Sequence, residues 1–443
     1  MLNRDEAKAV LDRVLALCSA ADGAEAYAGG GSNALTRFAE NTIHQNVVGT
    51  SQSVSVRARV GNRVGAAGTD RMDDASLQWM VDAAVESAKC SAPDPELLPL
   101  LGPQEYREVD AWSDDATTDA FGPEGRAAAV GEIVAACNAE GLKAAGSFAN
   151  GHGGGGLANT EGLFAYRCST GAGLSVTVAG EDSTGWAGAD SHAMADIDPM
   201  AVGMGAVTKA LASRSPREIE PKPYTVILEP EAVADMLSFI GSHFNALAVD
   251  EGRSFLSDGK LGQKVVGDNI TLTSDPYHPL QRGSSYDGEG LPRQRLTLID
   301  KGVARDLAYD RLTAQKHGVE PTGHGAGGSN TYGAYPSHLC LEGGDATVED
   351  IVRTTDYGVW ITRLHYLRTV DPNKLIITGM TRDGCLWVQG GEVKYAVKNM
   401  RFNESLLHML SHVTMLGVPE RRGGIVVPPL RVEGFHFTSR TEF

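Results

Sequence analysis

Apolar residues recur at helical spacing from the start of the chain. Over residues 5–18 one face collects Ala7, Val10, Leu11, Val14, Leu15 and Cys18. This period predicts a first helix. The same spacing predicts helices from Asp73-Asp74 through residue 88 and over residues 123–140, 199–212, 231–248, 347–357 and 403–416. Acidic residues at 73–74 and the proline at 123 stand where helix starts favour them.

Strand patterns fill the intervals between these helices. After a break at Gly29-Gly30-Gly31, residues 34–47 and 52–68 have the pattern of strands, and Gly61-Asn62 predicts a tight turn. Between residues 143 and 190 we expect short strands joined by glycine-rich turns, and the run Gly151–Gly156 is interpreted as a flexible hairpin connection. Further strands are predicted at 224–228, in a hairpin over 294–310, and as three strands over 374–398, before a tail rich in proline and glycine.

The order of these elements predicts the fold class. Helices and strands are mixed without a regular βαβ alternation, which favours an α+β protein over a doubly wound sheet. The proline-rich stretch from Ser213 to Pro223 is the predicted domain boundary. It separates an N-terminal α+β domain, residues 1–215, from a hairpin-rich C-terminal α+β domain, residues 222–443.

Composition narrows the class of protein. The chain has 443 residues, 42% hydrophobic and 21% charged, and a formal net charge of −17. A field of that sign repels phosphate backbones, so no direct nucleic-acid binding is expected. Apolar residues nowhere run long enough to span a membrane, and no membrane partner is expected. The six cysteines form no CxxC pair and indicate reduced thiols, so a cytoplasmic location is expected.

The helix predicted over residues 231–248 is the best candidate for a metal-binding helix. A zinc hydrolase helix needs two imidazoles about one turn apart and a glutamate beside them. This segment reads Ser238-Phe239-Ile240-Gly241-Ser242-His243 and supplies one histidine. His243 is therefore interpreted as a partly buried structural histidine rather than a ligand.

Other candidate motifs are weak or lie in loops. Four histidines, at positions 317, 324, 338 and 365, match no common metal-ligand spacing. The glycine run at 151–156 lacks the ending of a phosphate-binding loop. Three polar segments stand out: Tyr286–Pro292, Pro321–Gly325, and Thr381–Gly384, whose Asp-Gly pair predicts a hairpin turn. The residues expected to contact a substrate are His243, Tyr286, Asp287, Glu289, His324, Arg382 and Asp383.

Several segments, in order along the chain, resemble one family. They are Arg37–Gln45, Ala158–Gly162, Ser254–Leu256 with Lys260–Val265, Tyr286–Pro292, Pro321–Gly323, Thr381–Gly384 and Asn399–Ser405. Together they resemble the TldD/PmbA proteins, and specifically the PmbA branch, also called TldE. The older family label is modulator of DNA gyrase.

This resemblance implies a two-domain α+β fold and a place in a cytosolic zinc peptidase that degrades unfolded peptides or matures modified ones. In that family the TldD-type subunit carries zinc on an HExxxH helix, with a later cysteine as a further ligand. The family pattern places Ser238 at the first histidine of that helix, Phe239 at the glutamate and His243 at the second histidine. No cysteine follows Cys385, so the expected later ligand is also missing. We therefore expect no metal or cofactor on this chain and zinc on a partner.

Three hypotheses remain open. The first is a non-catalytic, substrate-binding subunit that pairs with a TldD-type subunit, or forms a homodimer, and is inactive alone. The second is a stand-alone homodimeric metallopeptidase-like enzyme with an unrecognised metal site. The third is a regulatory or binding protein without a protease partner.

Overall fold

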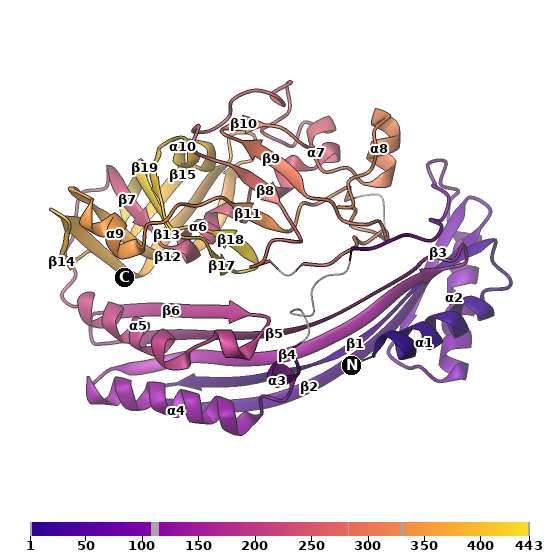
Figure 1. The fold of residues 1–443 in the computed structure, drawn as a ribbon, viewed down its shortest axis with the longest axis horizontal. Helices are drawn as coiled ribbons and strands as arrows, with labels where there is room; N and C mark the ends of the chain where they lie inside the picture. Colours follow the sequence, from indigo (N-terminus) through magenta and orange to yellow (C-terminus); the bar gives the residue numbers. More distant parts are fainter. Residues whose placement is uncertain (1, 108–114, 282, 329–331, 442–443) are drawn as a thin grey trace.

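Three β-sheets organise the chain in the computed structural model, which describes residues 2–107, 115–281, 283–328 and 332–441. One long sheet is built from the N-terminal half, and two sheets are built from residues after 222. The long sheet curves beneath the other two (Figure 1). Mixed helices and strands without βαβ repetition make this an α+β fold, as the sequence predicts.

The N-terminal sheet is antiparallel, with the order β3-β2-β1-β4-β5-β6. Its strands are β1 Gly23–Ala39, β2 Thr42–Val60, β3 Arg63–Thr69, β4 Lys143–Asn159, β5 Phe164–Ala179 and β6 Thr184–Ser191. Its helices are α1 Arg4–Leu17, α2 Asp74–Cys90, α3 Ala116–Asp119, α4 Pro123–Ala139 and α5 Pro199–Ala212. The predicted helices at the start of the chain, after Asp73 and after Gly122 are confirmed within two residues at each end.

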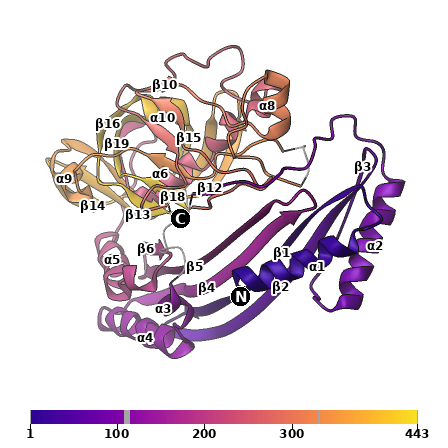
Figure 2. The same cartoon turned by 45° about the vertical axis from the view of Figure 1, so that its right-hand side comes forward.

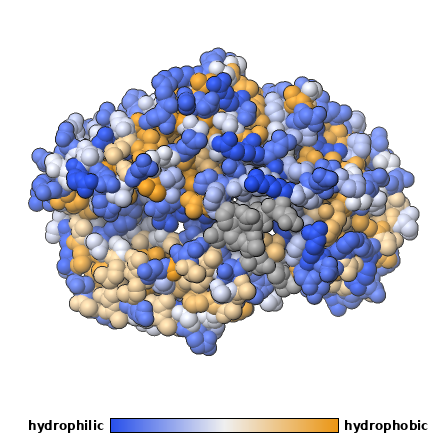
Figure 3. Space-filling model, in the orientation of Figure 1, coloured by the Kyte–Doolittle hydropathy of each residue, from blue (hydrophilic) through white to orange (hydrophobic). Residues whose placement is uncertain are grey.

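Helices cover one face of this sheet. The other face carries no helix and is turned toward the C-terminal half (Figure 2). α1 and α2 pack on β1, β2 and β3 around Leu11, Val56 and Leu77. α4 and α5 pack on β4 and β5 around Ile133 and Val176. The surface over α4 and α5 is mildly hydrophobic (Figure 3), since both helices are rich in alanine.

Glycine runs lie inside strands, so the predicted break at residues 29–31 and the predicted connection at 151–156 are wrong. β1 and β4 place these runs side by side, pairing Gly29 with Gly155 and Gly31 with Gly153. A Cβ on Gly31 would lie 2.3 Å from the carbonyl oxygen of His152. The runs are therefore part of a tightly spaced sheet, and the segment from 143 to 191 forms three long strands rather than many short ones.

The C-terminal half contains two sheets. The first has the order β10-β9-β8-β11-β18-β17. Its strands are β8 Leu272–Ser274, β9 Leu296–Asp300, β10 Val303–Ala304, β11 Leu339–Leu341, β17 Glu420–Arg422 and β18 Ile425–Val427. The hairpin predicted about Asp300-Lys301-Gly302 is confirmed as β9 and β10.

The second sheet follows the order β12-β7-β19-β15-β13-β14, and an additional pairing of β12 with β13 closes five of these strands into a ring. The strands are β7 Pro223–Leu228, β12 Tyr357–Asp371, β13 Ile376–Gln389, β14 Glu392–Ala396, β15 Met400–Ser405, β16 Val413–Leu416 (paired with β19) and β19 Leu430–Arg440. The helices of this half are α6 Pro230–Leu237, the 3₁₀ helix η3 Gly241–Phe244, α7 Ala246–Asp250, α8 Arg311–His317, α9 Val348–Arg353 and α10 Leu406–Ser411.

Four sequence predictions fail in the part of the chain after residue 373. The helix predicted over 403–416 is the short helix α10 between β15 and β16, and the predicted tail supplies β19 to the ring. Residues 374–398 form two strands instead of three, because β13 continues through Thr381–Gly384. There Thr362 of β12 lies opposite both Asp383 and Gly384, so the predicted hairpin turn is a β-bulge.

Within the described residues, no helix is both long and apolar enough to cross a membrane.

Candidate functional site

A cavity of about 450 Å³ lies between the N-terminal sheet and the loops of the C-terminal half. The sheet contributes side chains from β1, β2 and β5, among them Tyr27, Arg57 and Arg167. The opposite wall comes from the loops around residues 286–293 and 324–328. The cavity is therefore bounded by segments far apart in the sequence.

Asp287 organises the loop on this second wall. Its Oδ1 accepts backbone N–H groups of Glu289 and Leu291, both at 2.9 Å, and its Oδ2 accepts the N–H of Gly325 at 2.7 Å. The carboxylate thus closes its own turn, as aspartate does in many turns, and fastens it to the neighbouring loop. Burial raises the pKa of Asp287, and these three N–H donors oppose that shift.

Tyr286 anchors the same loop to the N-terminal half. Its hydroxyl donates to the carbonyl of Gly155 in β4 at 3.4 Å, and its ring lies 5.5 Å from that of Tyr106, centroid to centroid. The hydroxyl of Tyr106 in turn donates to the carbonyl of Gly290 at 2.7 Å. Two aromatic residues therefore fix the loop wall against the sheet.

His324 is a buried part of this wall. Its Nδ1 lies 2.8 Å from the carbonyl oxygen of Thr322, and its Nε2 lies 3.2 Å from Oγ of Ser274. Nδ1 therefore carries the proton and donates, while Nε2 accepts from the serine hydroxyl. Burial and then the charge of Arg293 lower the pKa of His324 to about 4, so the ring is neutral at pH 7.

Three arginines, at positions 57, 167 and 293, line the cavity together with the carboxyl groups of Glu25 and Asp287. Arg293 donates from Nε to the carbonyl of Tyr286 at 3.1 Å and from Nη1 to that of Gly323 at 3.4 Å, so it bridges both loops. Arg57 pairs with Glu25 at 3.6 Å. Arg167 has no ion pair within the described part of the chain. An anion entering the cavity would therefore meet a guanidinium that is not neutralised by the protein.

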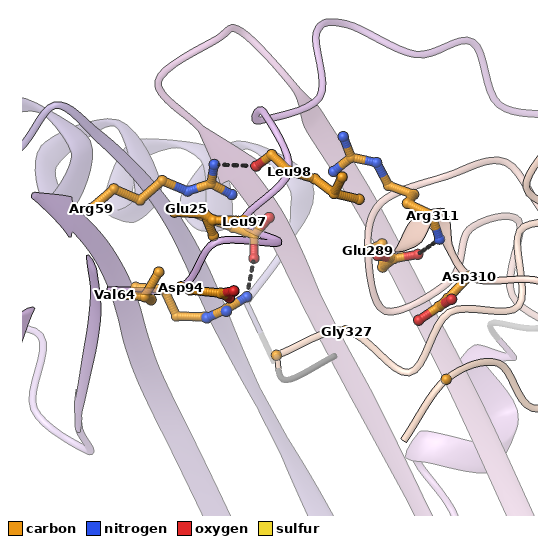
Figure 4. A pocket seen from close by; sticks show the side chains of 13 residues that line it. Glu25, Arg59, Val64, Asp94, Leu97, Leu98, Glu289, Asp310, Arg311 and Gly327 are labelled. Atoms are coloured by element: carbon orange, nitrogen blue, oxygen red, sulfur yellow. Dashed lines mark hydrogen bonds and ion pairs between the residues drawn. The ribbon is translucent and has the colours of Figure 1, made fainter. Parts of the chain in front are cut away.

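Glu289 faces a smaller adjoining cavity of about 200 Å³ (Figure 4). Its Oε2 accepts the backbone N–H of Arg311 at 3.1 Å, and across this cavity Arg59 donates to the carbonyl of Leu98. Burial first, and then the charge of Asp287, raise the pKa of Glu289 to about 7. This carboxyl group is thus close to half-protonated at neutral pH.

Two domain models of one protein family match this chain. The PmbA/TldA metallopeptidase C-terminal domain matches residues 221–439, and domain 1 of the same family matches residues 24–88. These two matches together span more than half of the chain. It belongs to the PmbA/TldD metallopeptidase family.

Relatives match along nearly the whole chain. Metalloprotease PmbA of Escherichia coli O157:H7 is 25% identical over 398 residues, which is 84% of either chain. Among solved structures, TldE of Thermococcus kodakarensis superposes with a TM-score of 0.87 at 18% identity, covering 97% of this chain and all of that one. A candidate modulator of DNA gyrase from Thermotoga maritima also reaches a TM-score of 0.87, at 20% identity and with the same coverage.

The segment where the family places its zinc helix does not fit a zinc ion here. The helix predicted over residues 231–248 is broken: α6 ends at Leu237, Ser238 is its C-terminal cap, and His243 lies in the separate turn η3. Ser238 Oγ donates to the carbonyl of Asp235 at 2.8 Å, and Phe239 packs partly buried against the core. No imidazole or carboxylate stands at the first two family positions, so zinc chemistry cannot be derived from them.

His243 is buried and bonded to neighbouring residues. Its side chain is buried, its Nδ1 accepts the backbone N–H of Phe255 at 3.2 Å, and its carbonyl accepts the hydroxyl of Ser254 at 2.6 Å. Burial lowers its pKa to about 4. Cys385, the last cysteine of the chain, is buried in β13, and burial raises the pKa of its thiol to about 12. Neither side chain is presented to the cavity.

Four of the seven residues expected to contact a substrate line one of the two cavities, and three line neither. Tyr286, Asp287 and His324 line the larger cavity and Glu289 the smaller one. His243, Arg382 and Asp383 line neither. Asp383 is buried in the β13 bulge and pairs there with Arg363, whose guanidinium lies over the ring of Trp186.

The sequence did not reveal the cavity arginines or the group of titratable side chains in the second sheet. Arg57, Arg167 and Arg293 come from three separate segments, so no local motif connects them. Of the four histidines at 317, 324, 338 and 365, His338 has its pKa lowered to about 3, first by burial and then by neighbouring charges that include His324. The group that could hold a metal among the described residues is instead Glu404, His408 and His436. Glu404 and His408 are four positions apart in the sequence, a spacing that could have indicated that their side chains lie close together.

Proposed function

We propose that this chain is a non-catalytic, substrate-binding subunit of a cytosolic zinc peptidase of the TldD/TldE type, with zinc and catalysis on a TldD-type partner. The observation that carries the proposal is the segment Ser238–His243. It ends one helix, turns, and buries its only histidine against Phe255. A chain built this way at the family's zinc position needs another subunit to supply the reactive centre.

The cavity supports a role in holding peptide. A peptide presents carbonyl groups, side-chain carboxylates and a C-terminal carboxylate, and arginine is well suited to bind carboxylates. Arg167 on the sheet and Arg293 on the loop wall line the same cavity of about 450 Å³. Tyr27, Tyr286 and Tyr335 add aromatic surface without demanding one sequence.

The edge of β2 supports a partner. β3 pairs only with residues 54–60 of β2, so residues 42–53 present an open strand edge in the described structure. Almost every residue of that stretch is exposed, including Ile43, Val47 and Val48. An open edge with apolar side chains is a surface to which another chain can add a strand. We propose that the TldD-type subunit docks there.

The test co-expresses this chain with a TldD-type subunit and measures cleavage of unfolded peptides by the purified complex. Arg167→Gln is expected to raise KM about tenfold, the effect of losing one charge-assisted hydrogen bond, with an unchanged amount of complex. Arg71→Gln, on an arginine that is 74% exposed outside both cavities, is the matched control. An Arg167→Gln complex with wild-type KM contradicts the substrate-binding role. Failure of the two chains to co-purify contradicts the partnership.

A further inference from the structure

The second C-terminal sheet gathers one carboxylate and two imidazoles at a single point. Glu404 comes from β15, His408 from α10 and His436 from β19. One potential ligand atom from each of the three lies within 4.8 Å of the others. This is the only such group of three found among the described residues.

The contacts orient all three side chains toward a common centre. Glu404 Oε1 lies 2.8 Å from Nδ1 of His408, and its Oε2 lies 3.0 Å from Nδ1 of His436. The same Oε2 accepts the backbone N–H of His436 at 2.7 Å, which fixes the plane of the carboxylate. The two rings lie 4.9 Å apart, centroid to centroid.

The three side chains differ in their exposure to solvent. The side chain of Glu404 is 1% exposed, whereas those of His408 and His436 are 32% and 48% exposed. A buried carboxylate is unfavourable unless it is hydrogen-bonded and its charge is compensated. Within the described chain its ion-pair partners are these two histidines and no arginine or lysine. The carboxyl group of Glu404 therefore lies at the bottom of the group, and the two partly exposed imidazoles lie between it and solvent.

We infer that Glu404, His408 and His436 form a binding site for a divalent transition metal, with Zn²⁺ as the expected ion. Imidazole nitrogens and one carboxylate suit zinc, whereas calcium and magnesium favour all-oxygen sites. Tetrahedral zinc with bonds of about 2.0–2.1 Å separates its ligand atoms by about 3.3 Å. The observed 2.8 and 3.0 Å contacts reach that spacing by a shift of a few tenths of an ångström.

Coordination has a defined chemical requirement. Each Nδ1 must offer its lone pair to the metal, so a proton on Nδ1 has to move to Nε2 or to solvent, and the two hydrogen bonds to Glu404 are replaced by metal bonds. The third carboxylate contact, from the backbone of His436, is retained as an outer support. The ion would join β15, α10 and β19, which ties the short helix α10 to two neighbouring strands of the ring.

His412 adjoins the group but is not counted as a ligand. Its ring lies tilted against that of His408 with centroids 4.1 Å apart, and its Nδ1 donates to the carbonyl of His408 at 2.8 Å. Its position instead limits how far the ring of His408 can turn.

The experiment titrates tag-free, metal-depleted full-length chain with Zn²⁺ alone, using calorimetry and a thermal melt. One zinc per chain and a higher Tm are expected, because the ion binds the folded state. His408→Ala and His436→Ala should each weaken zinc binding on the order of 100-fold, since each removes one of three ligands. Both positions are partly exposed, so these variants are expected to fold. Co²⁺ in place of Zn²⁺ should give a visible absorption band that the double variant lacks.

His317→Ala is the matched control, because this histidine pairs with Asp250 away from the site. Glu404→Gln keeps the shape of the buried side chain and should also weaken binding. No zinc bound at one equivalent would overturn the site. So would zinc that survives both histidine substitutions and is lost with His243→Gln. The measurement uses neither peptide nor partner, so its outcome is independent of the proposed function.

Discussion

His243, His324 and Asp287 are polar side chains with little exposure, and backbone groups hold each of them. The sequence favoured a structural role for His243 over a ligand role, and the structure buries this side chain and bonds it to the backbone of Phe255. It also placed Asp287 and His324 in polar loops, but it could not show that these loops meet. The bonds that join them, from Gly325 to Asp287 and from Arg293 to Gly323, connect residues 30 or more positions apart.

His243 should make the folded protein less stable at acidic pH. Its pKa falls from 6.5 to about 4 on folding, so the unfolded state binds the proton more readily and stability decreases as the pH drops from 7 toward 4. His243→Gln keeps an acceptor for Phe255 but cannot titrate. Between pH 7 and 4 the wild type should lose about 3 kcal/mol more than this variant, measured by urea unfolding. His44→Gln, on an exposed strand, should follow the wild type. Equal losses in wild type and His243→Gln would contradict a buried neutral ring.

Glu289 should give the stability of the protein the opposite dependence on pH. Its pKa is raised to about 7, so the folded state holds the proton and stability is lost as the pH rises from about 4.5 through 7. Glu289→Gln cannot ionise and can still accept the N–H of Arg311. The variant is expected to be more stable than wild type by roughly 2 kcal/mol at pH 8, after allowance for partial exposure, and equal to it at pH 4. Denaturant unfolding at both pH values measures this, and a variant less stable at pH 8 refutes the assignment.

At the scale of elements, the sequence was most reliable for the helices before residue 213 and less reliable for the strands and for the helices predicted over 231–248 and 403–416. α4 and α5 were located because the proline at the start of each helix is a local feature of the sequence. The glycine runs of β1 and β4 were misassigned because the need for glycine comes from the close approach of the neighbouring strand, which no local pattern shows. The Asp383-Gly384 bulge was misassigned for a similar reason: Asp383 is held by Arg363 on the neighbouring strand, and a turn and a bulge share the same residue preferences.

Glycine pairing between β1 and β4 gives an element-scale prediction. A Cβ at Gly31 would lie 2.3 Å from the carbonyl oxygen of His152, so Gly31→Ala forces the two strands apart. We expect a loss of about 1–3 kcal/mol in the free energy of unfolding. The matched control is its register partner Gly153, where an added Cβ meets nothing within 4 Å. Equal thermal and urea midpoints for Gly31→Ala and Gly153→Ala would show that close approach is not the reason for the glycine.

At the scale of the whole molecule, the cavity lies where the two halves of the chain meet. The order of family motifs in the sequence indicated the family and the α+β fold, both of which the comparisons and the sheets confirm. The arginines of the cavity could not be located, because the sheet and the loops that present them are brought together only by the packing of the two halves. Contacts such as Tyr106 to Gly290 set that packing.

The open edge of β2 provides a prediction about assembly. Val48 is 62% exposed on the unpaired stretch of this strand. Val48→Asp places a charge in the proposed interface and should weaken binding of the TldD-type subunit at least tenfold, because a buried unpaired charge is strongly unfavourable. Val370→Asp, on a 58% exposed valine of β12, is the control. Calorimetric titration of the two purified subunits measures both, and equal affinity for the two variants would place the interface elsewhere.

The most direct test of the central claim is peptide cleavage measured on three samples: this chain alone, a TldD-type subunit alone, and their equimolar mixture, each with and without a zinc chelator. The account predicts that this chain alone cleaves nothing and that the mixture cleaves unfolded peptide faster than the partner alone. It also predicts that chelation abolishes this activity. Chelator-sensitive cleavage by this chain alone would contradict it.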